Sequence, residues 1–192
     1  MNIGVFGGTF NPPHTGHLIV AERVREELGL GKILFIPSSV SPHKQHHQSV
    51  DPAHRMEMVQ LAVLGQNFFE SSDIEVSRGG VSYTVETLGQ LKRKEPSNTF
   101  YLLIGFDNLV EFNTWKSPEQ IIELADVVVM TRPGFQLQEV PGEFQKRVTL
   151  CQVPEIGISS SDIRERVKEG KSIHYLVPKP VESYIYYRKL YV

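Results

Sequence analysis

The sequence has few of the features that mark extracellular or membrane-bound proteins. Its single cysteine, Cys151, cannot form a disulfide within the chain. No apolar run approaches the roughly 20 residues that span a bilayer. The opening segment MNIGVFGG lacks the basic stretch and long apolar run of a signal peptide. We therefore expect a soluble, cytoplasmic protein with no membrane partner.

The sequence also lacks an excess of charge of either sign. Its 22 acidic and 20 basic side chains leave a formal net charge of −2. This balance gives no broad attraction for nucleic acid, so we expect no nucleic-acid partner, and an anionic ligand must be bound by a local site. The 192 residues, without repeats or low-complexity segments, suit a single domain over 1–192. The oligomeric state stays open, a homo-oligomer included.

Short runs rich in β-forming residues recur along the chain. They are NIGVFG (2–7), KILFIP (32–37), TFYLLIG (99–105), DVVVMT (126–131) and VTLCQV (148–153). Most are continuously apolar, as buried parallel strands are. Amphipathic helical patterns lie between them and end the chain, at 18–28, after Asp51-Pro52, after Ser117-Pro118, in SSDIRERVKE before Gly170, and in PVESYIYYRKLYV (180–192). Ser117 and Gln120 form a capping-box pattern.

This alternation predicts a doubly wound, Rossmann-like α/β fold, a parallel sheet with helices on both faces. Such sheets bind ligands beyond the carboxyl ends of their strands. The chemistry should therefore lie in the loops that follow residues 7, 37, 105, 131 and 153.

The first of these loops, GGTFNPPHTGHL (7–18), has the composition of an anion-binding turn. Its glycines allow a close backbone approach, and the free N–H groups at the start of the next helix favour phosphate. His14 and His17 are three residues apart, so on a first helical turn they face the same side. There are two alternatives. The segment could be a capped helix whose histidines are incidental, or the histidines could form a His-x-x-His metal pair, although no third ligand is evident nearby.

A second motif, ISSSDIRERV (158–167), places three hydroxyl groups and Arg164 at the start of a helix. This pattern predicts a further phosphate site. Ser159 to Ser161 fit equally well as helix N-caps, with Arg164 as a solvated charge.

HTGH (14–17) and ISSSDIR (158–164) together resemble the signatures of the nucleotidyltransferase superfamily. Ser161 stands where threonine is common, and the hydroxyl is kept. The resemblance extends to the nicotinate-mononucleotide adenylyltransferase family along nearly the whole chain. It is carried by SPHK (41–44), YTVETL (83–88), GFDNLVEFNTW (105–115), TRPG (131–134) and YLVPKPVESYI (175–185). Ser41 precedes Pro42 where the family often has two prolines.

The resemblance implies an enzyme of NAD biosynthesis that joins ATP to nicotinate mononucleotide and releases pyrophosphate. It implies catalytic roles for His14, His17 and Arg164. Because the loop over 7–18 is rich in hydrogen-bond donors and poor in carboxylates, we expect Mg²⁺ to arrive on the ATP phosphates without a dedicated protein metal site. The resemblance assigns ATP binding to Gly7, Gly8, Thr9, Phe10, Gly105, Asp107, Arg132, Ile158, Ser160 and Ser161. It assigns mononucleotide binding to Lys44, Thr84 and Trp115.

Several of these residues also have plain structural explanations. Asp107 and Thr84 fit helix caps, and Lys44 fits a solvated loop charge. Trp115 is the only tryptophan and lies among polar residues, which favours a stacking surface over a place in the core, although packing remains an alternative. The histidines of the 38–50 loop, His43, His46 and His47, are expected to be exposed.

Two other functions compete with this one. Another superfamily member, such as a phosphopantetheine adenylyltransferase, would share the phosphate motifs. A nucleotide-binding sensor would keep the same motifs without turnover.

Overall fold

A computed structural model describes residues 1–42, 50–131 and 146–192. Within these ranges, six strands form one sheet in the order β3-β2-β1-β4-β5-β6, and every neighbouring pair is parallel. The strands are β1 (Asn2–Gly8), β2 (Lys32–Pro37), β3 (Phe69–Ser71), β4 (Thr99–Gly105), β5 (Asp126–Thr131) and β6 (Val148–Gln152). The predicted fold is confirmed, and β3 is an additional strand that the sequence did not predict.

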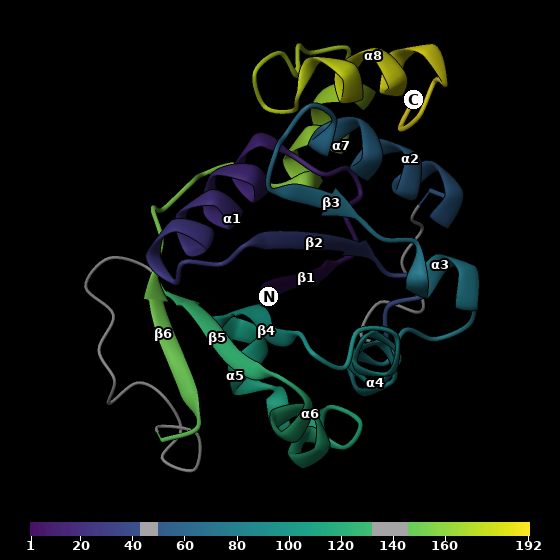
Figure 1. The fold of residues 1–192 in the computed structure, drawn as a ribbon. Helices are drawn as coiled ribbons and strands as arrows, with labels where there is room; N and C mark the ends of the chain where they lie inside the picture. The colour runs from purple at the N-terminus through teal and green to yellow at the C-terminus, as the bar shows by residue number, and fades with distance from the viewer. Residues whose placement is uncertain (43–49, 132–145) are drawn as a thin grey trace.

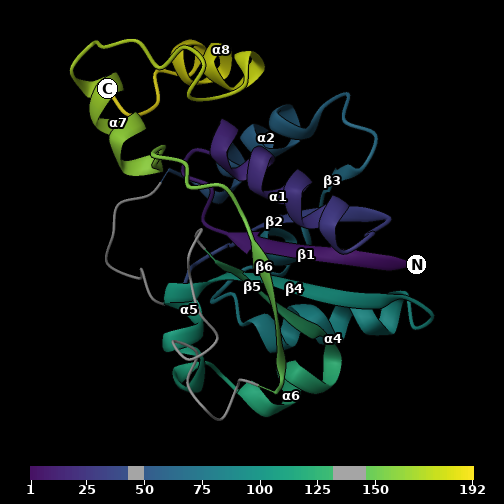
Figure 2. The same ribbon diagram turned by 90° about the vertical axis from the view of Figure 1, so that its left-hand side faces the viewer.

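Helices cover both faces of the sheet (Figure 1; Figure 2). In chain order they are α1 (Thr15–Glu27), α2 (Pro52–Val63), α3 (Ile74–Arg78), α4 (Thr84–Lys94), α5 (Phe106–Val110), the 3₁₀ turn η1 (Phe112–Thr114), α6 (Pro118–Leu124), α7 (Ser160–Lys168) and α8 (Lys179–Tyr187). The first two cover one face, and α4 to α6 cover the other.

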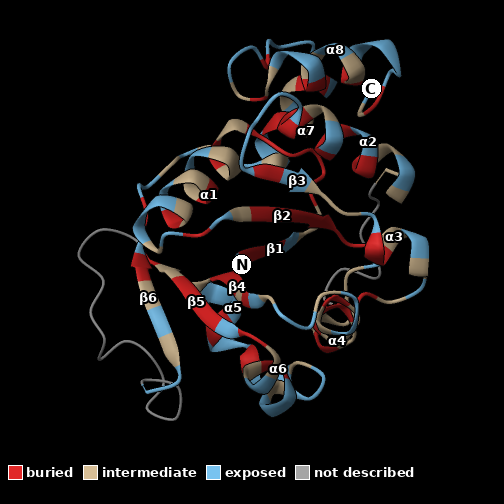
Figure 3. Cartoon of the chain, in the orientation of Figure 1, coloured by how far each residue is buried: buried red, intermediate tan, exposed pale blue. Residues whose placement is uncertain are grey.

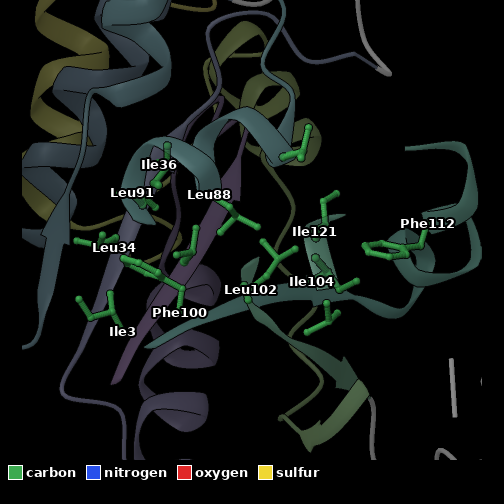
Figure 4. Packing of buried hydrophobic residues seen from close by; sticks show 14 of the residues in the cluster. Ile3, Leu34, Ile36, Leu88, Leu91, Phe100, Leu102, Ile104, Phe112 and Ile121 are labelled. Atoms are coloured by element: carbon green, nitrogen blue, oxygen red, sulfur yellow. The ribbon is translucent and has the colours of Figure 1, made fainter. Parts of the chain in front are cut away.

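The four central strands, β1, β2, β4 and β5, are largely buried because both faces of the sheet are covered (Figure 3). Ile3 and Val5 of β1 pack in one cluster with Leu88 of α4 and Ile121 of α6, and Figure 4 shows part of this packing. Phe6 points to the opposite face, into a cluster that includes residues of α1 and α2. The continuous apolar runs therefore arise from burial on two sides, as the sequence predicted.

A third cluster lies away from the sheet, where α7 and α8 pack on the outer side of α2 (Figure 2). Met58 and Ala62 of α2 belong to this cluster. Val59 and Val63 of the same helix belong to the cluster against the sheet. Helix α2 is thus buried on two sides and connects the C-terminal helices to the rest of the fold.

Some predicted helix ends are right and others are wrong. Asp51 caps α2 by accepting a hydrogen bond from the backbone N–H of Ala53 at 2.7 Å. The predicted capping box at Ser117 is wrong, because Ser117 has φ +53° and its side chain makes no capping hydrogen bond. The helix predicted over 180–192 is too long, since α8 ends at Tyr187. None of the helices in the described ranges is long and apolar enough to cross a membrane.

Candidate active site

Three adjoining cavities surround the carboxyl ends of the central strands, where the strand order changes direction between β1 and β4. This is where a doubly wound sheet is expected to bind its ligands. We name each cavity after one residue of its lining. The Trp115 cavity measures about 410 Å³, the Asp107 cavity about 720 Å³ and the Arg164 cavity about 710 Å³.

The turn after β1 supplies walls to all three cavities. Gly7 and Gly8 line the Trp115 cavity. A Cβ at Gly8 would lie 3.2 Å from the Phe10 ring, closer than usual packing, so the ring would have to shift to make room for it. Phe10 is buried with φ +47° and packs edge-on against His17, with ring centroids 5.1 Å apart. The glycines and Phe10 therefore shape the backbone turn that carries Thr9 to the edge of the Arg164 cavity.

His14 and His17 lie at the start of α1, and both side chains line the Asp107 and Arg164 cavities. Their rings stack with centroids 3.6 Å apart. Burial lowers the pKa of His14 to about 4. Burial, followed by the nearby His14, lowers the pKa of His17 to about 3. Both imidazoles are therefore neutral at pH 7.

The backbone fixes the proton position on His17. The N–H of His14 donates a hydrogen bond to Nδ1 of His17 at 3.1 Å. A neutral imidazole that accepts at Nδ1 carries its proton on Nε2. His17 thus offers a neutral N–H donor whose ring orientation is set by the helix start.

The ISSSDIR segment meets the first motif directly, although about 150 residues separate them in sequence. Ser160 Oγ donates to the carbonyl oxygen of Pro12 at 2.8 Å. Arg164 donates to the carbonyl oxygen of Asn11 at 2.8 Å and to Ser161 Oγ at 3.1 Å. Of the three serines, Ser159 is the N-cap of α7, since its side chain accepts from Asp162 N–H. Ser160, Ser161 and Arg164 all line the Arg164 cavity.

The Asp107 cavity is built from the ends of β4, β5 and β6. Gly105 is the N-cap of α5, and Asp107 lies in its first turn, so Asp107 does not itself cap the helix. Both residues line the cavity together with Thr131 and Ile158. The exposed carboxylate of Asp107 is suited to accept hydrogen bonds from a sugar hydroxyl bound in this cavity.

The Trp115 cavity contains Trp115 and Thr84. Thr84 is the first residue of α4, and its neighbour Tyr83 holds the N-cap position. Trp115 is half-buried, and its ring lies 5.3 Å from that of Phe112 and packs on the core cluster. Its environment therefore combines the two sequence-based alternatives, because the indole packs on the core and also lines the cavity. Lys116 adds a cation over the Tyr83 ring at 4.3 Å.

Two charged side chains near the cavities were not predicted. Arg55 of α2 is 1% exposed and donates to the carbonyl oxygens of Thr9, Ser39 and Val50. It thereby ties the turn after β1 to the loop after β2. Glu75 is buried beside the Trp115 cavity, accepts from Thr87 Oγ1 at 2.6 Å, and has its pKa raised by burial.

Other predicted residues fall outside the described ranges. Lys44, Arg132 and the histidines His43, His46 and His47 lie there, so their roles stay predictions. Within the described ranges, no three side chains among His, Cys, Asp and Glu gather as they would to bind a metal ion.

The fold is a doubly wound α/β sheet with cavities at the carboxyl ends of its central strands, and the profile of the cytidylyltransferase-like family matches residues 5–166. The chain is 43% identical over 196 residues to the "Probable nicotinate-nucleotide adenylyltransferase" of Desulfitobacterium hafniense strain Y51, covering 98% of this chain and 95% of that protein. It is 40% identical to the protein of the same name from Salinibacter ruber, with 100% and 98% covered. The chain therefore belongs to the nicotinate-nucleotide adenylyltransferase family, as its motifs indicated.

Solved structures agree on the fold. The Plasmodium falciparum nicotinic acid mononucleotide adenylyltransferase complexed with NaAD has a TM-score of 0.78 at 20% identity, covering 99% of this chain and 97% of that one. The same enzyme complexed with APC has a TM-score of 0.76 at 20% identity, with 99% and 96% covered.

Proposed function

We propose that this chain transfers the adenylyl group of ATP to the 5′-phosphate of nicotinate mononucleotide, forming nicotinate adenine dinucleotide and pyrophosphate. Family membership supports the reaction. The observation that carries the placement of the substrates is that the neutral histidine pair lies where the Asp107 and Arg164 cavities adjoin. The adenosine fits the Asp107 cavity, and the triphosphate fits the Arg164 cavity with its hydroxyl and guanidinium donors.

The mononucleotide fits the Trp115 cavity. The flat indole offers a stacking surface for the pyridine ring. Thr9, Ser38 and Ser41 line both this cavity and the Arg164 cavity. A phosphate held near these residues faces the triphosphate, which brings the attacking oxygen and the α-phosphorus together.

The chemistry then needs alignment and charge stabilisation. An oxygen of the mononucleotide phosphate attacks the α-phosphorus of ATP. The bond from that phosphorus to the bridging oxygen breaks, and pyrophosphate leaves with the electron pair. The second pKa of a phosphate monoester is about 6, so the attacking group is ionised at pH 7 without a general base. Catalysis reduces to positioning and to donors that meet the spreading negative charge.

His17 and Arg164 are the proposed donors for that charge. His17 presents Nε2–H, because its Nδ1 is already bonded. A neutral donor needs no proton transfer during the step. Arg164 is oriented by its bonds to Asn11 and Ser161, which leave its remaining N–H groups for phosphate oxygens.

Magnesium would enter on the ATP phosphates. The Arg164 cavity is lined by hydroxyl, imidazole and guanidinium donors, and the part of its lining that the structure describes contains no carboxylate. Hard cations prefer carboxylate and carbonyl oxygens, so phosphate oxygens and water are the proposed ligands. A cytoplasmic location is part of the same proposal, supported by the unpaired, buried Cys151.

Pyrophosphate release is the decisive measurement. Purified protein with MgATP should release pyrophosphate only when nicotinate mononucleotide is added, and mass spectrometry should find the dinucleotide. Activity with phosphopantetheine in place of the mononucleotide would assign the chain to another branch of the superfamily. ATP binding without turnover on either acceptor would identify a sensor and contradict the proposal.

A further inference from the structure

Asn11 occupies a central position that the sequence motifs did not single out. It follows Phe10 in the turn after β1 and is 7% exposed. Its carbonyl oxygen accepts the hydrogen bond from Arg164 at 2.8 Å. Asn11 is one of the residues that line the Arg164 cavity, as are His14 and His17. Asn11 is therefore held at the same place where the proposed function puts the triphosphate.

The side chain of Asn11 is bonded from the far end of the chain. The hydroxyl of Tyr191 donates to Oδ1 of Asn11 at 2.8 Å, across 180 residues of sequence. Tyr191 follows α8, where Leu190 is buried in the third cluster and its N–H bonds back to Ile185. Tyr191 has φ +66°, in the left-handed region that disfavours residues with a Cβ atom. Packing of the C-terminal cluster therefore holds the Tyr191 backbone in an otherwise disfavoured conformation, and this conformation places the phenol ring.

The electrostatic surroundings favour the phenol as the donor in this bond. Burial raises the pKa of Tyr191, so the hydroxyl stays protonated. The positive charges of Arg164 and Arg55 also act on this hydroxyl group, and they lower its pKa. The lone pairs of the Tyr191 hydroxyl oxygen face these positive charges. The hydroxyl proton therefore points away from the two arginines, toward Oδ1 of Asn11.

This bond decides which half of the Asn11 amide faces the cavity. A primary amide has one acceptor oxygen and one donor nitrogen on opposite sides. With Oδ1 bonded to Tyr191, Nδ2 is the remaining polar atom, and it has no partner in the described part of the chain. A flipped amide would instead present an oxygen to phosphate oxygens, which repel it.

We propose that Asn11 donates a hydrogen bond from Nδ2 to a phosphate oxygen of the bound nucleotide, and that Tyr191 is the positioning residue that sets this amide orientation. The proposal rests on the proposed function for the identity of the nucleotide. It adds a donor from the turn after β1 and gives the segment after α8 a part in the site.

The experiment compares four single variants of the full chain, together with the double variant that combines Asn11→Ala and Tyr191→Phe. Asn11→Ala removes the amide. Asn11→Asp keeps the shape and the acceptor for Tyr191 but replaces the donor with a carboxylate oxygen. Tyr191→Phe keeps the ring and removes only the hydroxyl. Tyr184→Phe is the matched control, because Tyr184 also bonds through its hydroxyl at 2.8 Å, but to His54 and outside the cavities.

The expected results separate a donor role from a structural one. Asn11→Ala should lower kcat/KM for ATP by about 10- to 100-fold, the range for a hydrogen bond to a charged group. Asn11→Asp should lose more than Asn11→Ala, since a carboxylate repels phosphate. Tyr191→Phe should lose about 3- to 10-fold, leave KM for the mononucleotide unchanged, and have no further effect in the Asn11→Ala background. Tyr184→Phe should match the parent in turnover.

Two results would overturn the proposal. One is an Asn11→Asp variant that uses ATP as well as the parent does. The other is a Tyr191→Phe variant that loses only thermal stability, to the extent that Tyr184→Phe does. The Kd for MgATP, measured by calorimetry in every variant, keeps this test separate from the proposed function. If the parent binds ATP but transfers nothing, the order of the Kd values still confirms or refutes the roles of Asn11 and Tyr191.

Discussion

Acidification should destabilise the protein through its buried histidine pair. An ordinary histidine has a pKa near 6.5, whereas burial lowers that of His14 to about 4 and that of His17 to about 3. Below pH 6.5 the unfolded chain therefore binds protons that the folded chain does not. The free energy of unfolding must fall as pH falls through this window. At pH 5, each histidine accounts for a loss of up to about 2 kcal/mol relative to pH 7.

The assay is urea unfolding of the ligand-free protein at pH 7 and pH 5, with the same measurement on His17→Asn. Carboxylates titrate in both proteins, so only the difference between them reports the histidine. The variant should lose about 2 kcal/mol less than the parent between the two pH values. An equal loss in parent and variant, or a His17 ring that titrates near pH 6.5 by NMR, would refute the argument that His17 is buried in its neutral form.

Substitutions at four residues test other parts of the site. His17→Ala should keep the fold and lower kcat by about 10² to 10³, the usual cost of one charge-stabilising donor, in steady-state assays; near-normal turnover would exclude it from the mechanism. Arg164→Lys should fail to restore the ATP kcat/KM lost in Arg164→Ala, since an ammonium group cannot reproduce the fork that bonds Asn11 and Ser161. Trp115→Ala should raise the mononucleotide KM about 5- to 150-fold, equivalent to about 1–3 kcal/mol of stacking. In the parent protein, mononucleotide binding should quench the tryptophan fluorescence. An equal rise in the KM of ATP and of the mononucleotide would indicate that Trp115 serves packing alone. Arg55→Met should lower the free energy of unfolding by about 2–4 kcal/mol in urea, because three carbonyl groups lose their donor; an unchanged midpoint would contradict that role.

The sequence predicted the central sheet well because those strands are buried on both faces. A continuous apolar run such as KILFIP needs no tertiary information to be assigned. Strand β3 has only three residues, and α3 and α5 have five each, so none is long enough to show a period. Ser117 shows the opposite problem, since its capping-box spacing is present but its backbone conformation prevents the bond.

The site was predicted where residue type alone indicates a role. His14, His17 and Arg164 stand in motifs at strand ends, and the structure brings them to one cavity. Arg55 and Asn11 gave no comparable signal. A charged residue in a helical pattern is usually on the surface, and only the packing of α2 against two loops shows that Arg55 is buried.

The position of α7 and α8 has a thermodynamic consequence. Both helices pack with α2 in the third cluster, which contains no strand residue. His17, in contrast, belongs to α1, which packs on the sheet. Arg164 and Ser160 therefore stand on a helix of the third cluster, and the histidine turn stands on a helix that packs against the sheet. A ligand that contacts both helices binds only when the two lie together, so its binding free energy adds to the stability of that arrangement. Nucleotide binding and the local unfolding of the C-terminal helices are thus one linked equilibrium.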